Sequence, residues 1–120
     1  MYNMGGSSST SFTAEQEAPI KQQIASEPVI VFSKDYCPFC DKTKQLLKSN
    51  NISAKVVELN LEQNGDKLQG ILQSISGQRT VPNIFIAGKH IGGNSELQAM
   101  AGNGELKKAL DGAGISHSMA

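Results

Sequence analysis

Apolar runs along the chain alternate with segments whose apolar residues recur at helical spacing. Residues 29–33 (VIVFS) are apolar and mostly β-branched without alternation, which predicts a strand buried on both faces. Residues 54–59 (AKVVEL) predict a second strand. The segment between them predicts a helix that begins at Pro38 and ends near residues 49–51. Its inward side is expected to carry Cys40, Thr43, Leu46 and Leu47. Such a strand–helix–strand unit should be parallel, with a right-handed crossover.

The second half of the chain repeats both patterns. Residues 66–75 place four apolar side chains at i, i+3, i+4 and i+7, which predicts an amphipathic helix. Residues 83–87 and 89–91 predict two short strands that Gly88 joins into an antiparallel hairpin. The four apolar positions of the helix are Leu68, Ile71, Leu72 and Ile75.

Short helices are predicted at both ends of this core. Upstream of the first strand, a helix with Pro19 near its first turn would bury Ile20 and Ile24. Residues 94–101 and 104–112 predict two further helices. Their inward side chains should be Leu97, Met100, Leu106 and Leu110. The expected order is therefore α-βαβ-α-ββ-α-α, without an internal repeat.

Composition limits the chain to one ordinary domain. The 120 residues are 38% hydrophobic and 18% charged, enough to bury a core without crosslinks. Eleven basic and eleven acidic residues cancel, and no basic run indicates a nucleic-acid or membrane partner. No stretch approaches the roughly 20 apolar residues of a membrane span.

The two ends of the chain have little to bury. Residues 1–12 are rich in Gly, Ser and Thr and predict a disordered tail, part of which is equally well interpreted as a cloning remnant. No Lys or Arg precedes Lys21, and no apolar segment resembles a signal peptide, so we expect a cytoplasmic protein. The folded domain is expected over residues 13–112, followed by a flexible tail over residues 113–120.

Cys37 and Cys40 are the only cysteines, and their spacing allows three interpretations. A structural zinc site needs four ligands, and only His90 and His117 remain. A structural disulfide would close a very small loop, which removes little entropy from the unfolded chain. The third interpretation is redox chemistry, because a C-x-x-C pair after a buried strand, inside a βαβ unit, is typical of a thioredoxin-like site.

The position of Cys37 favours the attacking role in thiol–disulfide exchange. The nucleophile in that reaction is the thiolate, and the unpaired N–H groups of a helix N-terminus favour an anion. Lys34 is the nearest cation, and Arg79 and Lys42 would add to its field if the fold brings them close. Cys40 falls one turn into the helix on the inward side, so we assign it the resolving role.

Three motifs in register carry a resemblance to a known family. KDYCPFC (34–40), TVP (80–82) and GGNSEL (92–97) together resemble a dithiol glutaredoxin, over about residues 18–111. The resemblance implies a thioredoxin-like α/β fold, with a four-stranded mixed sheet flanked by helices on both faces. Thioredoxin itself fits less well, because its cysteines usually enclose Gly-Pro after a Trp, and the chain has no Trp.

The resemblance also implies a glutathione site. Pro82 matches a cis-proline facing the cysteines, and the backbone of Val81 would pair with the tripeptide like an added strand. Phe39 replaces the commoner Tyr and lacks its hydroxyl, and Glu96 replaces a frequent Asp. The residues expected to contact glutathione are Lys34, Tyr36, Phe39, Gln78, Arg79, Thr80, Val81, Pro82, Gly93, Asn94 and Ser95.

The function that the resemblance implies is glutathione-dependent thiol–disulfide exchange by a monomer. Glutathione would be a cosubstrate, with no tightly bound cofactor and no metal, and the other partners would be glutathionylated or disulfide-containing proteins. The alternative is a carrier that holds a 2Fe–2S cluster through Cys37 and glutathione, although Pro38 stiffens a position where such relatives often have a small residue. A thioredoxin-like reductase with protein partners only is a third possibility.

Overall fold

The computed structural model describes residues 12–120, and their elements follow the predicted order. The one addition is a 3₁₀ turn, η2, after the second strand, which the sequence analysis did not predict. The elements are α1 (Ala14–Ser26), β1 (Val29–Ser33), α2 (Pro38–Ser49), β2 (Lys55–Glu58), η2 (Leu59–Leu61), α3 (Gly65–Ser76), β3 (Asn83–Ile86), β4 (Lys89–Gly92), α4 (Asn94–Asn103) and α5 (Glu105–Gly112).

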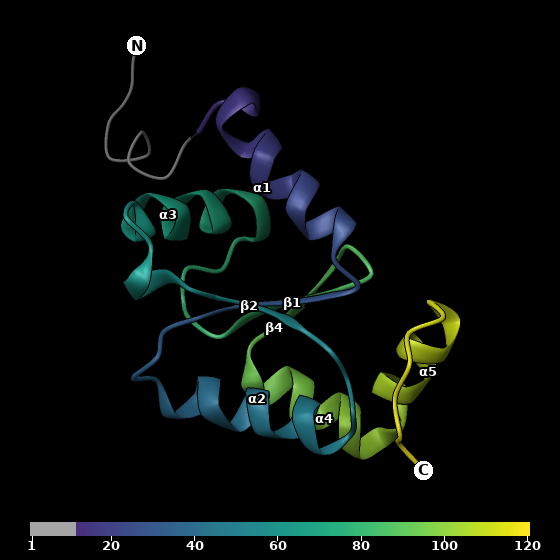
Figure 1. Cartoon of the computed structure of the whole chain (residues 1–120). Coiled ribbons are helices and arrows are strands. Elements are labelled where there is room, and N and C mark those ends of the chain that lie inside the picture. Colours follow the sequence, from purple (N-terminus) through teal and green to yellow (C-terminus); the bar gives the residue numbers. More distant parts are fainter. Residues whose placement is uncertain (1–11) are drawn as a thin grey trace.

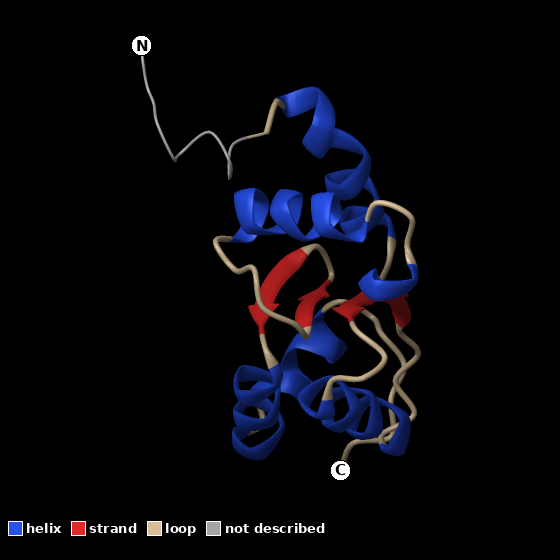
Figure 2. Cartoon of the chain, turned by 90° about the vertical axis from the view of Figure 1, so that its left-hand side faces the viewer, coloured by secondary structure: helices blue, strands red, loops and turns tan. Residues whose placement is uncertain are grey.

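The strands form one mixed sheet in the order β2-β1-β3-β4. β1 and β2 are parallel, as predicted for the strand–helix–strand unit, and β3 runs antiparallel to both β1 and β4. Helices α1 and α3 cover one face of the sheet, and α2 and α4 cover the other (Figures 1 and 2). The predicted architecture, a four-stranded sheet with helices on both faces, is therefore confirmed.

Alternation along the central strands divides the core between the two faces. In β1, Val29 and Val31 pack with the side chains of α2, α4 and α5, whereas Ile30 and Phe32 pack with those of α1 and α3. All five residues of this strand are buried, as its uninterrupted apolar run predicted. On the α1/α3 side, the rings of Phe32 and Phe85 meet edge to face at 6.0 Å.

The first helix begins earlier than the sequence analysis expected. Thr13 caps it: the Thr13 hydroxyl accepts a hydrogen bond from the Gln16 amide at 3.1 Å, and the Gln16 side chain accepts one from the Thr13 amide at 2.9 Å. Pro19 therefore lies inside the helix, and the prediction that it lies near the first turn was wrong. Ile24 is buried and Ile20 packs beside it, as predicted.

The residues after α5 fold back onto the C-terminal end of α2. Ile115 and Met119 pack against the core on that side. The Ser118 amide donates to the Asn50 carbonyl at 2.8 Å, and the Asn51 side chain donates to the Ser118 hydroxyl at 2.8 Å. The predicted domain bounds and the flexibility of 113–120 stay predictions, and the predicted N-terminal tail lies almost wholly outside the described residues.

Candidate active site

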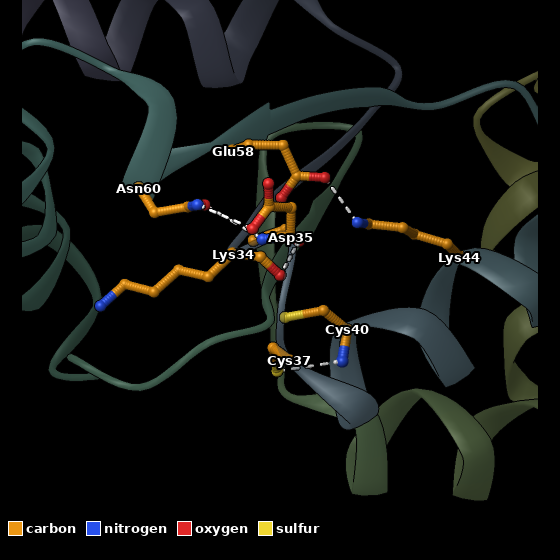
Figure 3. Close-up of polar contacts among 8 residues, drawn as sticks. Lys34, Asp35, Cys37, Cys40, Lys44, Glu58 and Asn60 are labelled. Carbon is orange, nitrogen blue, oxygen red and sulfur yellow. Dashed lines mark hydrogen bonds and ion pairs between the residues drawn. The ribbon is translucent and has the colours of Figure 1, made fainter.

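The two cysteines lie at the start of α2, shortly after the C-terminal end of β1. Cys37 is the N-cap, with extended backbone, and Pro38 occupies the first turn. The Cys40 amide donates to the Cys37 sulfur at 3.2 Å (Figure 3). An amide that would otherwise lack a partner therefore stabilises negative charge on Cys37. Both residues are free cysteines.

Cys40 differs from Cys37 in its exposure. Its side chain is 0% exposed, whereas Cys37 is half-buried. Burial, followed by the contact with Cys37, raises the pKa of the Cys40 thiol above its ordinary value. Cys40 is therefore held as a thiol at neutral pH, and Cys37 is the more exposed of the two sulfurs.

The loop that ends at β3 faces the cysteines. The Val81–Pro82 peptide bond is cis, as expected from the TVP motif. The Cys37 thiol lies 3.8 Å from the Val81 carbonyl oxygen. The Gln78 side-chain amide donates to the carbonyls of Thr80 (3.1 Å) and Pro82 (3.0 Å) and so fixes both sides of this loop.

A groove of about 210 Å³ opens beside Cys37, between this loop and the start of α4. Gly92 allows the tight approach of strand β4 to the helix: its φ is +120°, and a Cβ there would lie 2.9 Å from the Glu96 carboxylate. That carboxylate accepts a hydrogen bond from the Gly93 amide at 2.7 Å. The groove is lined by Phe39, Thr80, Val81, Pro82, Gly93, Asn94, Ser95 and Glu96.

Seven of the eleven residues predicted to contact glutathione line this groove, and four do not. The Lys34 side chain extends away from both sulfurs (Figure 3). Tyr36 is 68% exposed next to Cys37. Gln78 directs its amide into the loop, and the Arg79 guanidinium lies beside α3, where a Cβ on Gly70 would be 3.6 Å from it.

Two side chains outside the predicted set support the groove. The buried Thr43 hydroxyl of α2 donates to the Asn94 side-chain oxygen at 3.0 Å and so ties the cysteine helix to the first residue of α4. Glu96 lines the groove and caps Gly93. Helical spacing predicted an inward position for Thr43, but nothing in the local pattern indicated a partner 51 residues away.

Comparison with known proteins indicates the family of this chain. The sequence model of the glutaredoxin family matches residues 29–91, which include both cysteines and the cis-proline loop. Glutaredoxin-C4, chloroplastic, from Oryza sativa subsp. japonica is 51% identical over 94 residues, covering 78% of this chain and 71% of the relative. Glutaredoxin-C6 from the same species is 46% identical over 103 residues, covering 86% and 92%.

The chain belongs to the glutaredoxin family. Its structure is similar to that of a buckwheat glutaredoxin–glutathione complex, with a TM-score of 0.79, 38% identity, and coverage of 86% of this chain and 97% of that one. The thioredoxin-like fold expected from the sequence is thereby confirmed, and so is the oxidoreductase class: the chain is a glutathione-dependent thiol-disulfide oxidoreductase.

Within 12–120 there is no group of three or more His, Cys, Asp and Glu side chains arranged to hold a metal ion. Within the same residues, no helix is both long and apolar enough to cross a membrane.

Proposed function

We propose that this glutaredoxin uses Cys37 alone to reduce protein–glutathione mixed disulfides. The Cys37 thiolate attacks the glutathione sulfur, the protein thiolate leaves, and the glutathione stays on Cys37 as a mixed disulfide. A second glutathione thiolate then attacks the glutathione sulfur of this adduct and expels the Cys37 thiolate. The glutathionyl group of the substrate and one free glutathione thus become one oxidised glutathione, and the protein sulfur leaves with the electron pair of the broken disulfide bond and takes up a proton.

For disulfides within or between proteins, the proposed route uses both cysteines. Cys37 attacks one sulfur and forms a mixed disulfide with the substrate, whose other sulfur leaves as a thiolate. Cys40 then attacks Cys37, the second substrate sulfur leaves, and an internal Cys37–Cys40 disulfide remains. Glutathione reduces that disulfide in two further exchanges.

The groove beside Cys37 is the proposed glutathione site. The N-terminus of α4 at Asn94 and Ser95 suits a carboxylate, because backbone N–H groups and the helix dipole favour an anion there. The Val81 backbone is available next to the Cys37 sulfur for strand-like pairing with the cysteinyl part of the tripeptide. The buckwheat relative in complex with glutathione supports this proposal.

Four residues predicted to contact glutathione lie outside the groove. In this proposal three of them act as long or exposed side chains, and the fourth supports the loop. Lys34 and Arg79 have long side chains that can swing toward a bound carboxylate, and Tyr36 is exposed beside Cys37. Gln78 would instead act through the loop that its amide holds.

The observation that carries the role assignment is the difference in exposure between two sulfurs three residues apart. Cys37 is half-buried and its sulfur lies 3.8 Å from the carbonyl oxygen of Val81, which lines the groove, whereas Cys40 is fully buried. Only the first is open to in-line attack on a bulky disulfide. The second is placed for an internal reaction with the first.

Single serine variants test these roles. Cys37→Ser should abolish turnover of every substrate, because no other accessible thiol remains among the described residues. Cys40→Ser should retain reduction of a small glutathione mixed disulfide and lose reduction of protein disulfides that need the internal step. Steady-state assays with glutathione and glutathione reductase measure both. Retention of deglutathionylation by Cys37→Ser together with its loss in Cys40→Ser would reverse the assignment.

We also propose a monomer whose macromolecular partners are glutathionylated or disulfide-containing proteins, located in the cytoplasm, although two of its relatives are named chloroplastic proteins.

The cluster-carrier alternative has a separate test. Anaerobic reconstitution with iron, sulfide and glutathione should give no visible cluster absorbance if the chain is an oxidoreductase only.

A further inference from the structure

Polar side chains from three elements meet beneath the cysteines, on the face of the sheet that α2 covers. Val57 packs into the core on the α1/α3 side, so the next residue of the strand, Glu58, points to the α2 side. Ser33 is the partner of Glu58 across the parallel β1–β2 pair. With Cys40 and Lys44 of α2, these two residues form what we call the sub-cysteine cluster: Ser33, Cys40, Lys44 and Glu58. Figure 3 shows Cys40, Lys44 and Glu58.

Lys44 and Glu58 form an ion pair inside this cluster. The Lys44 Nζ lies 2.5 Å from Glu58 Oε2, and the two side chains are only 27% and 22% exposed. Burial opposes both charges and is the largest single effect, but the hydrogen bond between them, their mutual attraction and smaller contributions from neighbouring groups together outweigh it, so the pKa of Glu58 is lowered and that of Lys44 is raised. Both groups are therefore charged throughout the neutral range.

The pair is held close to Cys40. Lys44 follows Cys40 by four residues on the same helix, which places the two side chains on neighbouring turns of one face. The attraction of a Cys40 thiolate also raises the pKa of Lys44. The second carboxylate oxygen, Glu58 Oε1, is buried and has no hydrogen-bond partner. An unpartnered buried oxygen is costly, so Glu58 holds Lys44 in place at some expense of stability.

Other charged groups around Cys40 have different placements. The Lys34 side chain extends away from it (Figure 3), and Lys42 lies over the Phe39 ring at 5.4 Å. Asp35 is bonded to the Asn60 amide at 2.8 Å. The titratable groups on the elements around Cys40 include Cys37, the N-cap of α2, and Asp41 and Lys44 within this helix. The others are Lys34 and Asp35 of the preceding loop and Glu58 of β2.

We propose that Lys44, positioned by Glu58, is the cation that favours the Cys40 thiolate and so sets the rate of the internal resolving step. This inference rests on the proposed two-cysteine route. Glu58 has two opposing effects: it holds the ammonium in place, and its negative charge reduces the field that Lys44 exerts on the sulfur. Lys44 and Glu58 are positioning residues, because neither touches the substrate.

The resolving step replaces the Cys37–substrate disulfide with a Cys37–Cys40 disulfide. The Cys40 thiol releases its proton to solvent, and the resulting thiolate attacks the Cys37 sulfur of the mixed disulfide. The Cys37–substrate bond breaks, the Cys37–Cys40 bond forms, and the substrate sulfur leaves with the electron pair and takes up a proton. Because only the thiolate reacts, the rate near neutral pH follows the fraction of Cys40 that is ionised.

Removing the positive charge and removing the negative charge should change the rate of the resolving step in opposite directions. Loss of packing would slow it in both variants. Lys44→Met removes the cation and should slow resolution about three- to tenfold at pH 7, as expected for a partly screened charge. Glu58→Gln keeps the shape but removes the opposing charge, so resolution should become faster by a similar factor. Lys44→Arg keeps the charge and should stay within about twofold of the wild type.

The experiment uses the full chain. Reduced protein is mixed with oxidised glutathione, quenched with acid at intervals, and analysed by mass spectrometry for the Cys37–glutathione adduct and the internal disulfide, between pH 6 and 9. Lys48→Met, one turn further along α2, and Glu62→Gln, beyond η2, are the charge-matched controls. Measured in the Cys40→Ser background, adduct formation on Cys37 should not respond to Lys44→Met.

Two results would overturn the proposal. One is a slower step in both Lys44→Met and Glu58→Gln, which would indicate loss of structure or a carboxylate that accepts the proton of Cys40. The other is no change in either variant beyond that of its control. If the wild type forms no internal disulfide at all, the two-cysteine route itself fails, and that failure is distinguishable because it appears before any variant is made.

Discussion

Residues of the same type have different roles here because of where the fold puts them. Cys37 and Cys40 are three positions apart, yet one is half-buried next to the groove residue Val81 and the other is fully buried. Lys44 pairs with a strand carboxylate, while Lys42, two positions earlier, lies over an aromatic ring. At this scale the chemistry follows from which turn of α2 a residue occupies.

Thr43 gives a prediction at the same scale. Its buried hydroxyl donates to the Asn94 side chain, and Asn94 is the first residue of the helix that borders the groove. Thr43→Val keeps the volume and removes this bond, leaving Asn94 its contact with Gln98 at 3.2 Å. We expect a loss of about 1 kcal/mol in the free energy of unfolding, and a KM for a glutathione mixed disulfide about two- to fivefold higher.

Thr43→Ser is the matched control, because it retains the hydroxyl. Chemical denaturation and steady-state kinetics measure the two effects. An unchanged KM in Thr43→Val, with the stability loss present, would mean that Asn94 does not depend on this bond for its place in the groove.

The residues of the groove were predictable from the sequence, but several side-chain directions were not. Pro82 and Gly93 belong to motifs whose backbone has few alternatives, and both line the groove as expected. Lys34 and Arg79 have long side chains with many rotamers, and neither enters it. Gln78 was expected at a ligand, yet its amide has two backbone acceptors within 3.1 Å.

The hairpin of β3 and β4 supports the cis-proline loop through a chain of polar contacts. The buried Asn83 side chain donates to the Gln78 carbonyl at 3.2 Å, and Gln78 in turn holds the carbonyls of Thr80 and Pro82. On the other side, Asn83 Oδ1 lies 2.9 Å from His90 Nε2, so a ring N–H there donates to it. The loop beside Cys37 is thus tied to both strands.

His90 makes the stability of this hairpin depend on pH. Burial lowers the pKa of His90 in the folded state, and the Glu96 charge offsets this only in part. Below the unfolded value of about 6.5, the unfolded chain binds a proton that the folded chain resists. Neutral His90 therefore contributes stability in full above that pH, and this contribution is lost as the pH falls through the pKa of His90 in the folded state. We expect a lower thermal midpoint at pH 5.5 than at pH 7.5.

His90→Gln isolates this effect, because glutamine retains an N–H donor but does not titrate in this range. The fall in midpoint between the two pH values should be smaller in His90→Gln than in the wild type, and His117→Gln should keep the contribution of His90. Equal falls in the wild type and His90→Gln would assign the pH dependence to other groups.

Whole elements were easier to predict than their ends. The strands 29–33 and 83–86 form as expected because their apolar runs are long enough for burial on both faces. The start of α1 was misplaced because a proline was taken as a sign of the first turn, while the Thr13–Gln16 capping box lies further upstream. The turn η2 has no periodic pattern of its own and follows β2 directly.

Across the whole molecule, α2 has the cysteines at its N-terminal end and the docked C-terminal residues of the chain at its other end. Cys37 caps one end of the helix, and Asn50 caps the other, where the C-terminal residues dock. Twelve residues at about 1.5 Å per residue separate the two ends by about 18 Å. Figure 1 shows the C-terminus on the side of the molecule away from the start of α2. Stability and catalysis should therefore be separable here.

Deletion of residues 115–120 tests that separation. It removes the packing of Ile115 and Met119 and the hydrogen bonds of Ser118. We expect the free energy of unfolding to fall by about 2–3 kcal/mol, while kcat for a glutathione mixed disulfide at 25 °C changes less than about twofold. Deletion of Ala120 alone removes none of these contacts and serves as the control. If the longer deletion leaves stability unchanged, the segment is the flexible tail that its composition predicted, because docked apolar side chains cannot be removed without cost.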